Sequence, residues 1–423
     1  MSSSGLSTPT SESDLCFSGV STPATEHSVL FDDDFNFTTS AQVTKPITDD
    51  FILVVGGLGY IGSHTSFELL KTGQNIIIID NLSNCNLQAL KNLEILRDNH
   101  FRTQDARPTI DFYSADFRNQ VAINTILTKY QNERPRHAGP PYCSKSKISG
   151  VIHFAGYKSV SQSFQKPLEY YANNVAGMVE FLTTLSKFDI KTFVFSSSAT
   201  VYGELANSGN RLVETQCDAT SCSGLTNPYG RTKWMCEAIL NDLAVSDPEW
   251  TIMALRYFNP IGCDESGMLG ENPKDTPNNL MPIVVQAMKG EREHLDIFGT
   301  DWDTRDGTAI RDFIHVSDLA SGHLAALRAT KRENFGPGFH VYNLGTGTGH
   351  SVMEIVTAMQ SASGRTIPTK LSPRRGGDVG ICVAEPSKSA VNLNWKTRKT
   401  LEQACWDICR YIGKSRKKTS AAV

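Results

Sequence analysis

The sequence has little net charge, no long apolar run and no paired cysteines. A formal net charge of −3 over 423 residues gives no basic field that would concentrate the chain on nucleic acid or an anionic membrane. No apolar run approaches the roughly 20 residues that span a bilayer, and the N-terminus resembles neither a signal peptide nor a transit peptide. The ten cysteines include no CxxC pair and no His/Cys spacing typical of zinc. We therefore expect reduced thiols, a cytoplasmic protein without a metal, and a small molecule rather than nucleic acid or a membrane as partner.

Three segments differ in composition from the rest of the chain. Residues 1–46 are rich in Ser and Thr, contain one Lys and no Arg, and include an acidic run. Such a segment cannot bury enough apolar surface to offset the entropy lost on ordering, so we predict a disordered tail. Residues of about 133–147 combine prolines with several basic residues and predict a surface insertion. We expect a second short tail at 413–423.

From Phe51 onward, apolar runs of strand length alternate with segments of helix length. Continuous apolar runs are typical of strands that helices cover on both faces. This alternation predicts an α/β fold, a Rossmann-like doubly wound parallel sheet, followed by a smaller C-terminal α/β lobe. A sheet of this kind binds ligands at its carboxyl edge. The expected strands are 51–55, 75–79, 150–154, 192–195 and 252–257.

The first expected strand leads into a glycine-rich turn, GGLGYIG at 56–62. Glycine permits the tight turn, lets a pyrophosphate approach the backbone, and allows the next helix to aim its N-terminal amides at phosphate. Asp80 ends the second strand about 20 residues further on, where a carboxylate can accept a hydrogen bond from the adenosine ribose 2'-hydroxyl. The same carboxylate repels a 2'-phosphate, so the pattern favours NAD over NADP.

A second glycine cluster, at 345–349, lacks the acidic strand end that a dinucleotide site needs. Ser351 is followed three residues later by Glu354, the spacing of a helix capping box. We therefore interpret this cluster as a turn from a strand into a helix.

Tyr229 and Lys233 are four residues apart, so they lie on one face of a helix. A phenol with an ordinary pKa of about 10 becomes a base at neutral pH only if cations favour the phenolate. Lys233 and a nicotinamide ring carrying positive charge could supply that effect. Ser198 stands at the end of the fourth expected strand, beside the cofactor edge. Glycine turn, acidic strand end, serine and YxxxK thus occur in the order that builds a short-chain dehydrogenase site.

The sequence resembles the extended short-chain dehydrogenase/reductase family, and within it the UDP-glucose (UDP-galactose) 4-epimerases. The match runs from about Phe51 to Trp406. Segments typical of the epimerase-like members are HFAG at 153–156, PLEYY at 167–171, SATVYG at 198–203, RYFNP at 256–260, NNLMP at 278–282 and RRGGD at 374–378.

The resemblance implies an NAD-dependent isomerase of galactose metabolism that inverts C4 of UDP-hexoses through a 4-keto intermediate. It implies a mainly NAD-binding lobe at 47–258 and a mainly UDP-sugar-binding lobe at 259–412. It also suggests a homodimer joined through helices near 168–187 and 229–246.

The resemblance assigns Ser198, Tyr229 and Lys233 to catalysis. For NAD, the glycine turn and the positions matching the family give Gly56, Gly59, Tyr60, Ile61, Gly62, Asp80, Asn81, Asn84, Asp116, Phe117, Phe154, Lys158, Asn173, Tyr229, Lys233 and Tyr257. For the UDP-sugar the matching positions are Ser198, Tyr229, Asn259, Asn279, Leu280, Phe298, Arg311, Arg375, Asp378 and Cys382.

Cys382 is a candidate determinant of substrate range. In members restricted to glucose and galactose the matching residue is a Tyr, whose ring narrows the pocket near the sugar 2-substituent. The smaller Cys predicts room for an N-acetyl group, and hence UDP-GlcNAc and UDP-GalNAc as further substrates. The chain also has Phe313 where a Tyr is frequent.

Two other functions remain open at this point. A nucleotide-sugar 4,6-dehydratase shares the opening oxidation but places Asp-Glu after the serine or threonine, whereas this chain has Ala199 and Thr200. A non-catalytic NAD-sensing protein would need neither the serine nor the YxxxK pair.

Overall fold

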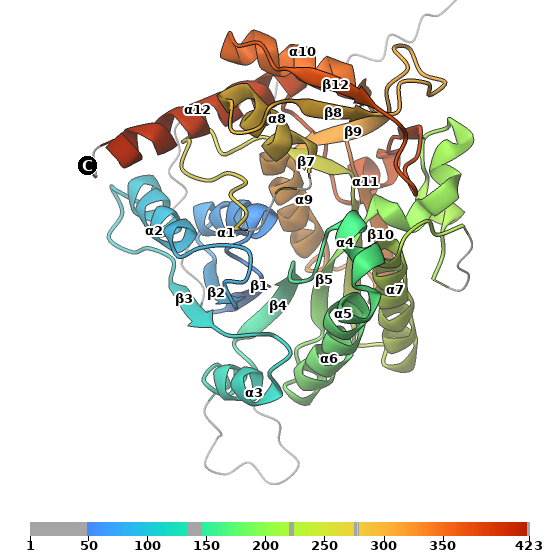
Figure 1. Ribbon diagram of the computed structural model, residues 1–423. Coiled ribbons are helices and arrows are strands. Elements are labelled where there is room, and N and C mark those ends of the chain that lie inside the picture. Colours follow the sequence, from blue (N-terminus) through green and yellow to red (C-terminus); the bar gives the residue numbers. More distant parts are fainter. Residues whose placement is uncertain (1–48, 133–144, 220–223, 275–276, 278, 421–423) are drawn as a thin grey trace, which may run out of the picture. The chain divides into compact units, whose positions relative to one another are not determined.

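The computed structural model describes residues 49–132, 145–219, 224–274, 277 and 279–420 (Figure 1). The expected tail at 1–46 and most of the expected insertion lie outside these residues. In the described part, Lys147 N–H donates to the Tyr130 carbonyl at 2.7 Å and Asn132 N–H to the Lys145 carbonyl at 3.1 Å. The two ends of the expected insertion are therefore joined by backbone hydrogen bonds.

The main sheet has seven parallel strands in the order β10-β6-β5-β4-β1-β2-β3. The predicted parallel α/β fold is confirmed, and all five predicted strands are present. Two strands were not among them: the edge strand β3, and β10, which the chain adds beside β6 after a long excursion. The strands are β1 Phe51–Val55, β2 Asn75–Asp80, β3 Ile110–Ser114, β4 Ile148–His153, β5 Thr192–Ser198, β6 Thr251–Tyr257 and β10 Gly338–Leu344.

Helices cover both faces of this sheet, as Figure 1 shows. In β1, Ile52 and Val54 pack against one helix group, and Leu53 and Val55 against the other. Alternate side chains of a strand point to opposite faces, which is why the whole strand is apolar. The first group is α1 Tyr60–Lys71, α2 Gln88–His100 and α9 Val316–Ala329. The second group is α3 Gln120–Thr128, α6 Gly177–Lys187 and α7 Pro228–Ser246. Three short helical segments lead into α6: α4 Val160–Gln165, α5 Pro167–Tyr170 and a π-helical stretch Tyr171–Ala176.

A smaller α/β lobe is built around its own apolar core. Strand β9 is its centre and pairs with β7, β11 and β13, while β8 pairs with β12. The strands are β7 Asn259–Ile261, β8 Leu295–Phe298, β9 Ile310–His315, β11 Gly349–Ser351, β12 Thr369–Ser372 and β13 Ile381–Cys382. The helices are α8 Leu280–Lys289, α10 Val352–Ser363, α11 Ser387–Asn392 and α12 Leu401–Ser420. Because α9 and β10 return to the main sheet, the two lobes share the C-terminal part of the chain.

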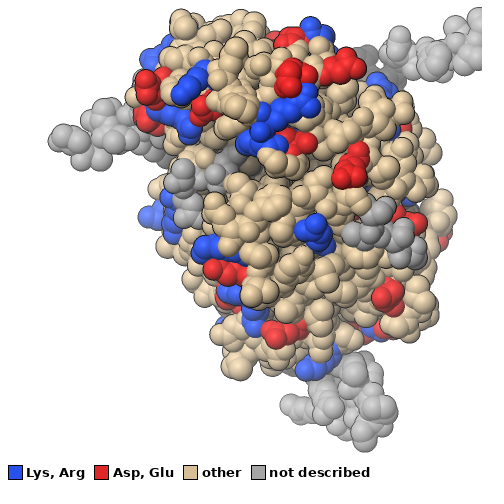
Figure 2. Space-filling view, turned by 45° about the vertical axis from the view of Figure 1, so that its right-hand side comes forward, with Lys and Arg blue, Asp and Glu red and all other residues tan. Residues whose placement is uncertain are grey.

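Helix α12 continues to Ser420, through most of the segment that the sequence suggested as a tail from residue 413. None of the helices in the described ranges has the length and hydropathy of a membrane span. On the face drawn in Figure 2, acidic and basic side chains are interspersed.

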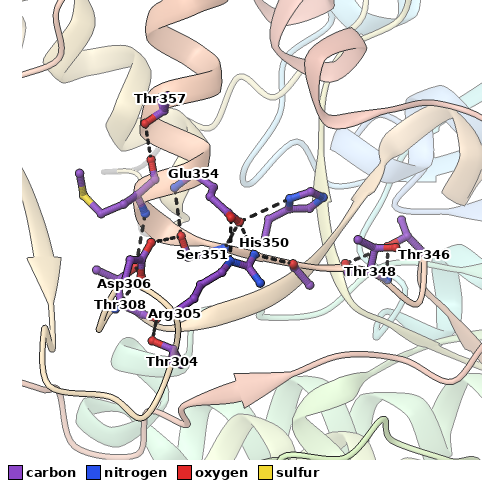
Figure 3. Close-up of polar contacts among 12 residues, drawn as sticks. Thr304, Arg305, Asp306, Thr308, Thr346, Thr348, His350, Ser351, Glu354 and Thr357 are labelled. Carbon is purple, nitrogen blue, oxygen red and sulfur yellow. Dashed lines mark hydrogen bonds and ion pairs between the residues drawn. The ribbon is translucent and has the colours of Figure 1, made fainter.

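The second glycine cluster is a strand-to-helix turn, as predicted. It follows β10 and leads through β11 into α10, where Ser351 and Glu354 form the expected capping box with bonds of 2.9 and 3.1 Å (Figure 3). The fully buried Asp312 carboxylate accepts from the backbone N–H groups of Thr346 and Gly347 at 2.8 and 2.9 Å. These amides are therefore occupied by the protein's own carboxylate.

Candidate active site

The first glycine turn forms a close-packed cradle between β1 and α1. Gly56 has a φ of +76°, and a Cβ on it would lie 2.8 Å from the Ala155 nitrogen. A Cβ on Gly62 would lie 2.2 Å from the Gly56 carbonyl oxygen. Helix α1 begins directly after Gly59, whose missing side chain leaves the helix N-terminus uncapped. The backbone here is shaped to receive an anion at a helix N-terminus.

Asp80 is fixed next to this turn by three donors. Its Oδ2 accepts from the Leu58 N–H at 3.1 Å, and its Oδ1 accepts from the Leu82 N–H at 2.9 Å and the Cys85 thiol at 3.2 Å. Only 8% of the residue is exposed, so the surrounding protein and these hydrogen bonds hold the carboxylate in one orientation. This is the place where the ribose of a dinucleotide on the glycine cradle would lie.

Ser198, Tyr229 and Lys233 meet where β5 ends and α7 begins. The Asn227 side chain caps α7 by accepting from the Gly230 N–H at 2.7 Å, which places Tyr229 in the first turn and Lys233 in the next. Lys233 Nζ donates to the Ser196 carbonyl at 2.6 Å and lies 6.0 Å from the Tyr229 ring centroid. Serine, tyrosine and lysine thus lie together as the motif order predicted.

Burial dominates the acid-base properties of these groups. Desolvation raises the pKa of Tyr229 to about 12, and a hydrogen bond with Ser198 opposes this rise. Desolvation lowers the pKa of Lys233 to about 8. The expected help from Lys233 to the phenolate is therefore outweighed by burial in the protein alone. A Tyr229 pKa low enough for a base at neutral pH therefore requires positive charge brought by a ligand.

A buried ion pair lies beneath the catalytic strand end, and the sequence reasoning missed its role. The Arg256 guanidinium binds the Glu237 carboxylate through Nε at 3.0 Å and Nη2 at 2.7 Å. Its other three donors reach the Tyr202 hydroxyl and the backbone carbonyls of Glu214 and Cys217. Glu237 also accepts from the Ser197 hydroxyl, beside Ser198. The available signal was a charged residue four positions after Lys233 on α7, together with an arginine in an apolar strand.

Further residues predicted for the cofactor lie on the same side of the site. Asp116 binds Arg118 in a fork at 2.9 and 2.7 Å and accepts from Asn81 Nδ2 at 3.0 Å. The hydrogen bonds from Arg118 lower the pKa of Asp116 to about 2. Tyr257 bonds to the buried His323.

The predicted substrate residues face this side from the smaller lobe. Asp378 lies between two arginines, at 3.4 Å from Arg311 Nη2 and 3.1 Å from Arg375 Nε. The Arg375 guanidinium also lies 4.5 Å from the Phe298 ring centroid. Cys382 pairs with Arg311 in the β13–β9 ladder and is 8% exposed. These side chains provide forked cationic donors and a carboxylate acceptor, a set that suits a diphosphate and ribose hydroxyls.

One cavity of about 940 Å³ joins both sides. Asp116 alone among the predicted residues does not line it; its carboxylate is turned to Asn81 and Arg118. Glu271, which the sequence reasoning did not single out, lines the cavity and contacts predicted residues of both groups. The predicted residues that line the cavity are Gly56, Gly59, Tyr60, Ile61, Gly62, Asp80, Asn81, Asn84, Phe117, Phe154, Lys158, Asn173, Ser198, Tyr229, Lys233, Tyr257, Asn259, Asn279, Leu280, Phe298, Arg311, Arg375, Asp378 and Cys382.

The residues present fit a dinucleotide. A Cβ on Gly56 or Gly62 would clash with backbone atoms of the cradle, and Asp80 offers a fixed acceptor one strand away. Among the described residues, no three His, Cys, Asp or Glu side chains come together as a metal site.

Comparison with known proteins places the chain in a class. A family model described as "NAD dependent epimerase/dehydratase family" matches residues 52–345, and the chain belongs to this family. The resemblance inferred from the motifs is thus confirmed.

Within the class, the chain is similar to several UDP-glucose 4-epimerases. The UDP-glucose 4-epimerase of Dictyostelium discoideum is 44% identical over 87% of this chain and 96% of its own length. The crystal structure of the Bifidobacterium longum UDP-glucose 4-epimerase, in complex with NAD+ and UDP, is 39% identical, with a TM-score of 0.75 over 86% of this chain and 99% of that one. The UDP-Glc/GlcNAc 4-epimerase of Campylobacter jejuni is 33% identical, with a TM-score of 0.68 over 86% and 99%.

Proposed function

We propose that this protein is an NAD-dependent isomerase that inverts C4 of UDP-hexoses, interconverting UDP-glucose and UDP-galactose. The observation that carries this proposal is the position of Ser198 and Tyr229 in one continuous cavity. On one side lies the glycine cradle with Asp80, and on the other side lie Arg311 and Arg375. The family and the relatives of high coverage support the same reaction.

In this proposal the glycine turn and Asp80 hold NAD, together with the other predicted cofactor residues that line the cavity. Arg311 and Arg375 neutralise the diphosphate of the UDP-sugar, and Asp378 accepts from its ribose. When bound, NAD+ would supply the oxidation as the acceptor of a hydride from C4, which would later be returned to that carbon. Positive charge brought by the bound cofactor would favour the phenolate of Tyr229 and so lower its pKa.

Tyr229 is the proposed base, and Ser198 is its partner at the sugar 4-hydroxyl. Tyr229 accepts the proton of the 4-hydroxyl as a 4-keto sugar forms, and it returns a proton to O4 when the ketone is reduced. Ser198, already bonded to Tyr229, can donate to the same oxygen. Lys233, with its ammonium held on the Ser196 carbonyl, stays a fixed positive charge beside the phenol. Because the protein grips mainly the UDP moiety, the keto sugar can turn and present its other face.

The 4,6-dehydratase alternative requires an acid and a base for elimination of water, beyond the residues that oxidise C4. The two positions after Ser198 are Ala199 and Thr200, and Thr200 donates through its N–H and hydroxyl to Ser198 Oγ at 3.2 and 3.0 Å. Neither residue is a carboxylic acid. The intact Ser198, Tyr229 and Lys233 likewise disfavour a purely NAD-sensing protein.

The experiment that tests the reaction is incubation with UDP-galactose and NAD, followed by separation of the products. The proposal predicts UDP-glucose in equilibrium with the substrate. A keto-deoxy sugar would instead identify a dehydratase, and unchanged UDP-galactose would support a non-catalytic protein.

The proposed substrate range includes UDP-GlcNAc and UDP-GalNAc. Cys382 lines the cavity, and its core cluster includes Tyr202 and Phe258, so its side-chain volume affects the space at this wall. The Campylobacter jejuni relative is named for both glucose and GlcNAc substrates. We expect wild type to convert UDP-GalNAc, and Cys382→Tyr to lose this activity while keeping UDP-galactose, because the ring excludes the N-acetyl group. Wild type without activity on UDP-GalNAc would refute the assignment of Cys382.

A homodimer in the cytoplasm, active in galactose metabolism, completes the proposal. The surfaces of α5, α6 and α7 expose Leu168, Val179 and Met235, which supports association through these helices. Six cysteines of the described ranges are free thiols, the state typical of a reducing compartment: Cys85, Cys236, Cys263, Cys382, Cys405 and Cys409. Sedimentation at two protein concentrations, with Leu168→Glu as the disrupting variant, tests the dimer.

A further inference from the structure

A segment of the smaller lobe crosses the cofactor side of the cavity. This crossing segment, residues 262–274, follows β7 and contributes cavity-lining residues from Met268 to Pro273. Three side-chain hydrogen bonds of 2.7 Å fasten it to the main-sheet lobe. They run from the Tyr60 hydroxyl to the Gly262 carbonyl, from Asn92 Nδ2 to the Met268 carbonyl and from Lys274 Nζ to the Leu82 carbonyl.

Helix α12 braces the crossing segment from behind. Arg410 Nη1 donates to the Glu265 carbonyl at 2.6 Å, and Lys414 donates to the Ser266 carbonyl. Gly270 lies against the Tyr411 ring so closely that a Cβ would be 2.8 Å from the ring carbon Cδ1. The crossing segment is therefore a fixed wall of the cavity.

Glu271 lies on this wall between the cofactor side and the UDP-sugar side of the cavity. Its Oε1 accepts from Lys158 Nζ at 3.1 Å and from Asn279 Nδ2 at 2.9 Å, and its side chain is 12% exposed. Lys158 stands in the loop after β4, on the cofactor side. Asn279 precedes α8, on the UDP-sugar side. One carboxylate oxygen thus orients a predicted donor of each site.

The donors retain capacity for ligands while they are bound to Glu271. A lysine ammonium has three N–H donors, and an asparagine side chain has two N–H donors and an acceptor oxygen. One donor of each is used on Glu271. Lys158 keeps two donors for a phosphate or ribose oxygen, and Asn279 keeps one donor and its carbonyl. Glu271 therefore aims these groups without occupying them.

We propose that Glu271 is a positioning residue that couples the binding of NAD to the binding of the UDP-sugar. This inference rests on the proposed function. A ligand that fixes Lys158 also fixes the carboxylate, and through it Asn279, so the second ligand meets a donor that is already ordered. The first ligand bears the entropy cost of ordering these side chains, so the second ligand binds at a lower entropy cost.

The coupling is measured with the full chain, freed of bound nucleotide, and with UDP and NAD as the two probes. Titration calorimetry gives the affinity for NAD with and without saturating UDP, and the affinity for UDP with and without saturating NAD. For wild type we expect each ligand to tighten the other by about fivefold or more, with the same factor in both directions because binding linkage is reciprocal.

Three variants separate coupling from general damage. Glu271→Ala should lower both affinities and bring the coupling factor close to one, raising KM for the UDP-sugar more than it lowers kcat. Glu271→Gln keeps an acceptor oxygen but not the charge, so its coupling should be intermediate. Glu265→Gln is the matched control, since Glu265 lies on the same segment and, among the described residues, its carboxylate pairs only with Lys399 at the surface, at 3.5 Å. It should behave as wild type.

Failure of the inference and failure of the proposed function look different. If wild type epimerises and binds both ligands without coupling, or if Glu271→Ala couples as wild type does, the inference is overturned alone. Tighter NAD binding by Glu271→Ala would also overturn it, because the carboxylate would then compete with the cofactor for Lys158. If wild type binds no UDP, both the inference and the proposed function are overturned.

Discussion

The two sides of the cavity recognise their proposed ligands by different means. On the cofactor side the glycine turn before α1 presents backbone that is packed too closely for a side chain at Gly56 or Gly62, and Asp80 is itself held by backbone N–H groups. On the UDP-sugar side the surface is made by the side chains of Arg311, Arg375 and Asp378. Backbone recognition depends on one conformation and tolerates no added atom. Side-chain recognition can be changed one residue at a time, so substrate range can vary while the cofactor site stays the same.

The largest effect is expected where the two sides meet. Tyr229→Phe removes the proton acceptor and little volume, so kcat should fall by about 10²- to 10⁴-fold while NAD stays bound. Steady-state rates with UDP-galactose, and NAD released on denaturing the purified variant, give both results. A variant with near-normal kcat would show that another group is the base.

A single added methyl group in the glycine turn should weaken the binding of NAD. Gly62→Ala places a Cβ 2.2 Å from the Gly56 carbonyl oxygen, and relief requires movement of the turn itself. Local strain of about 1–3 kcal/mol corresponds to roughly fivefold to 150-fold weaker NAD binding. Gly336→Ala is the control, because nothing lies within 4 Å of its added Cβ. Equal NAD affinity in both variants would contradict the close-packed cradle.

Acid should destabilise the cofactor side through buried histidines. Burial lowers the pKa of His153 to about 3 and those of His64 and His323 to about 4. The folded state holds these rings neutral, so they favour folding above a pH of about 6.5, and this stability is lost as the pH falls toward 4.

Each such histidine contributes a slope of about 1.4 kcal/mol per pH unit in that window. His153 packs among Phe117, Phe181 and Phe193, and neither ring nitrogen bonds to another residue in the described part of the chain. His153→Phe should therefore fold and remove the contribution of His153 to the slope. Denaturant unfolding between pH 5 and 7 measures it. An unchanged slope would mean that His153 does not take up a proton on unfolding.

The smallest effect is expected on the side-chain surface. Arg375→Lys keeps the positive charge but loses the fork toward Asp378 and the diphosphate. The Arg375 side chain is 55% exposed, so we expect a loss of UDP affinity of at most about tenfold, with NAD affinity unchanged. Calorimetry of both ligands decides this. A loss above a hundredfold would place Arg375 on a much more rigid surface than the structure shows.

The sequence predicted the parts of the molecule that local pattern determines. The buried strands and glycine turn, and Tyr229 with Lys233 on one helix face, follow from residue spacing alone. Strand β3 was not predicted because it is a short edge strand with half-buried side chains, which gives no continuous apolar run in the sequence. The position of β10 in the sheet was not predicted either, because this strand pairs with β6 only after the chain has passed through the smaller lobe.

The contacts around Glu237 and Glu271 could not be predicted, because they join residues through the tertiary fold. Glu271 reaches Lys158 across 113 positions of the sequence. Burial of Tyr229 belongs to the same class, since spacing indicated a nearby cation but not the desolvation that raises the phenol's pKa.

The central claim, that C4 gives up and regains its own hydrogen in this cavity, is tested most directly with UDP-galactose deuterated at C4. The products of the wild-type protein are separated, and the position of deuterium in each sugar is read by NMR. The account predicts UDP-glucose that still carries deuterium at C4, because the hydrogen removed from that carbon returns to it. Deuterium at C6 of a deoxy sugar, or UDP-galactose unchanged after prolonged incubation with NAD, would contradict it.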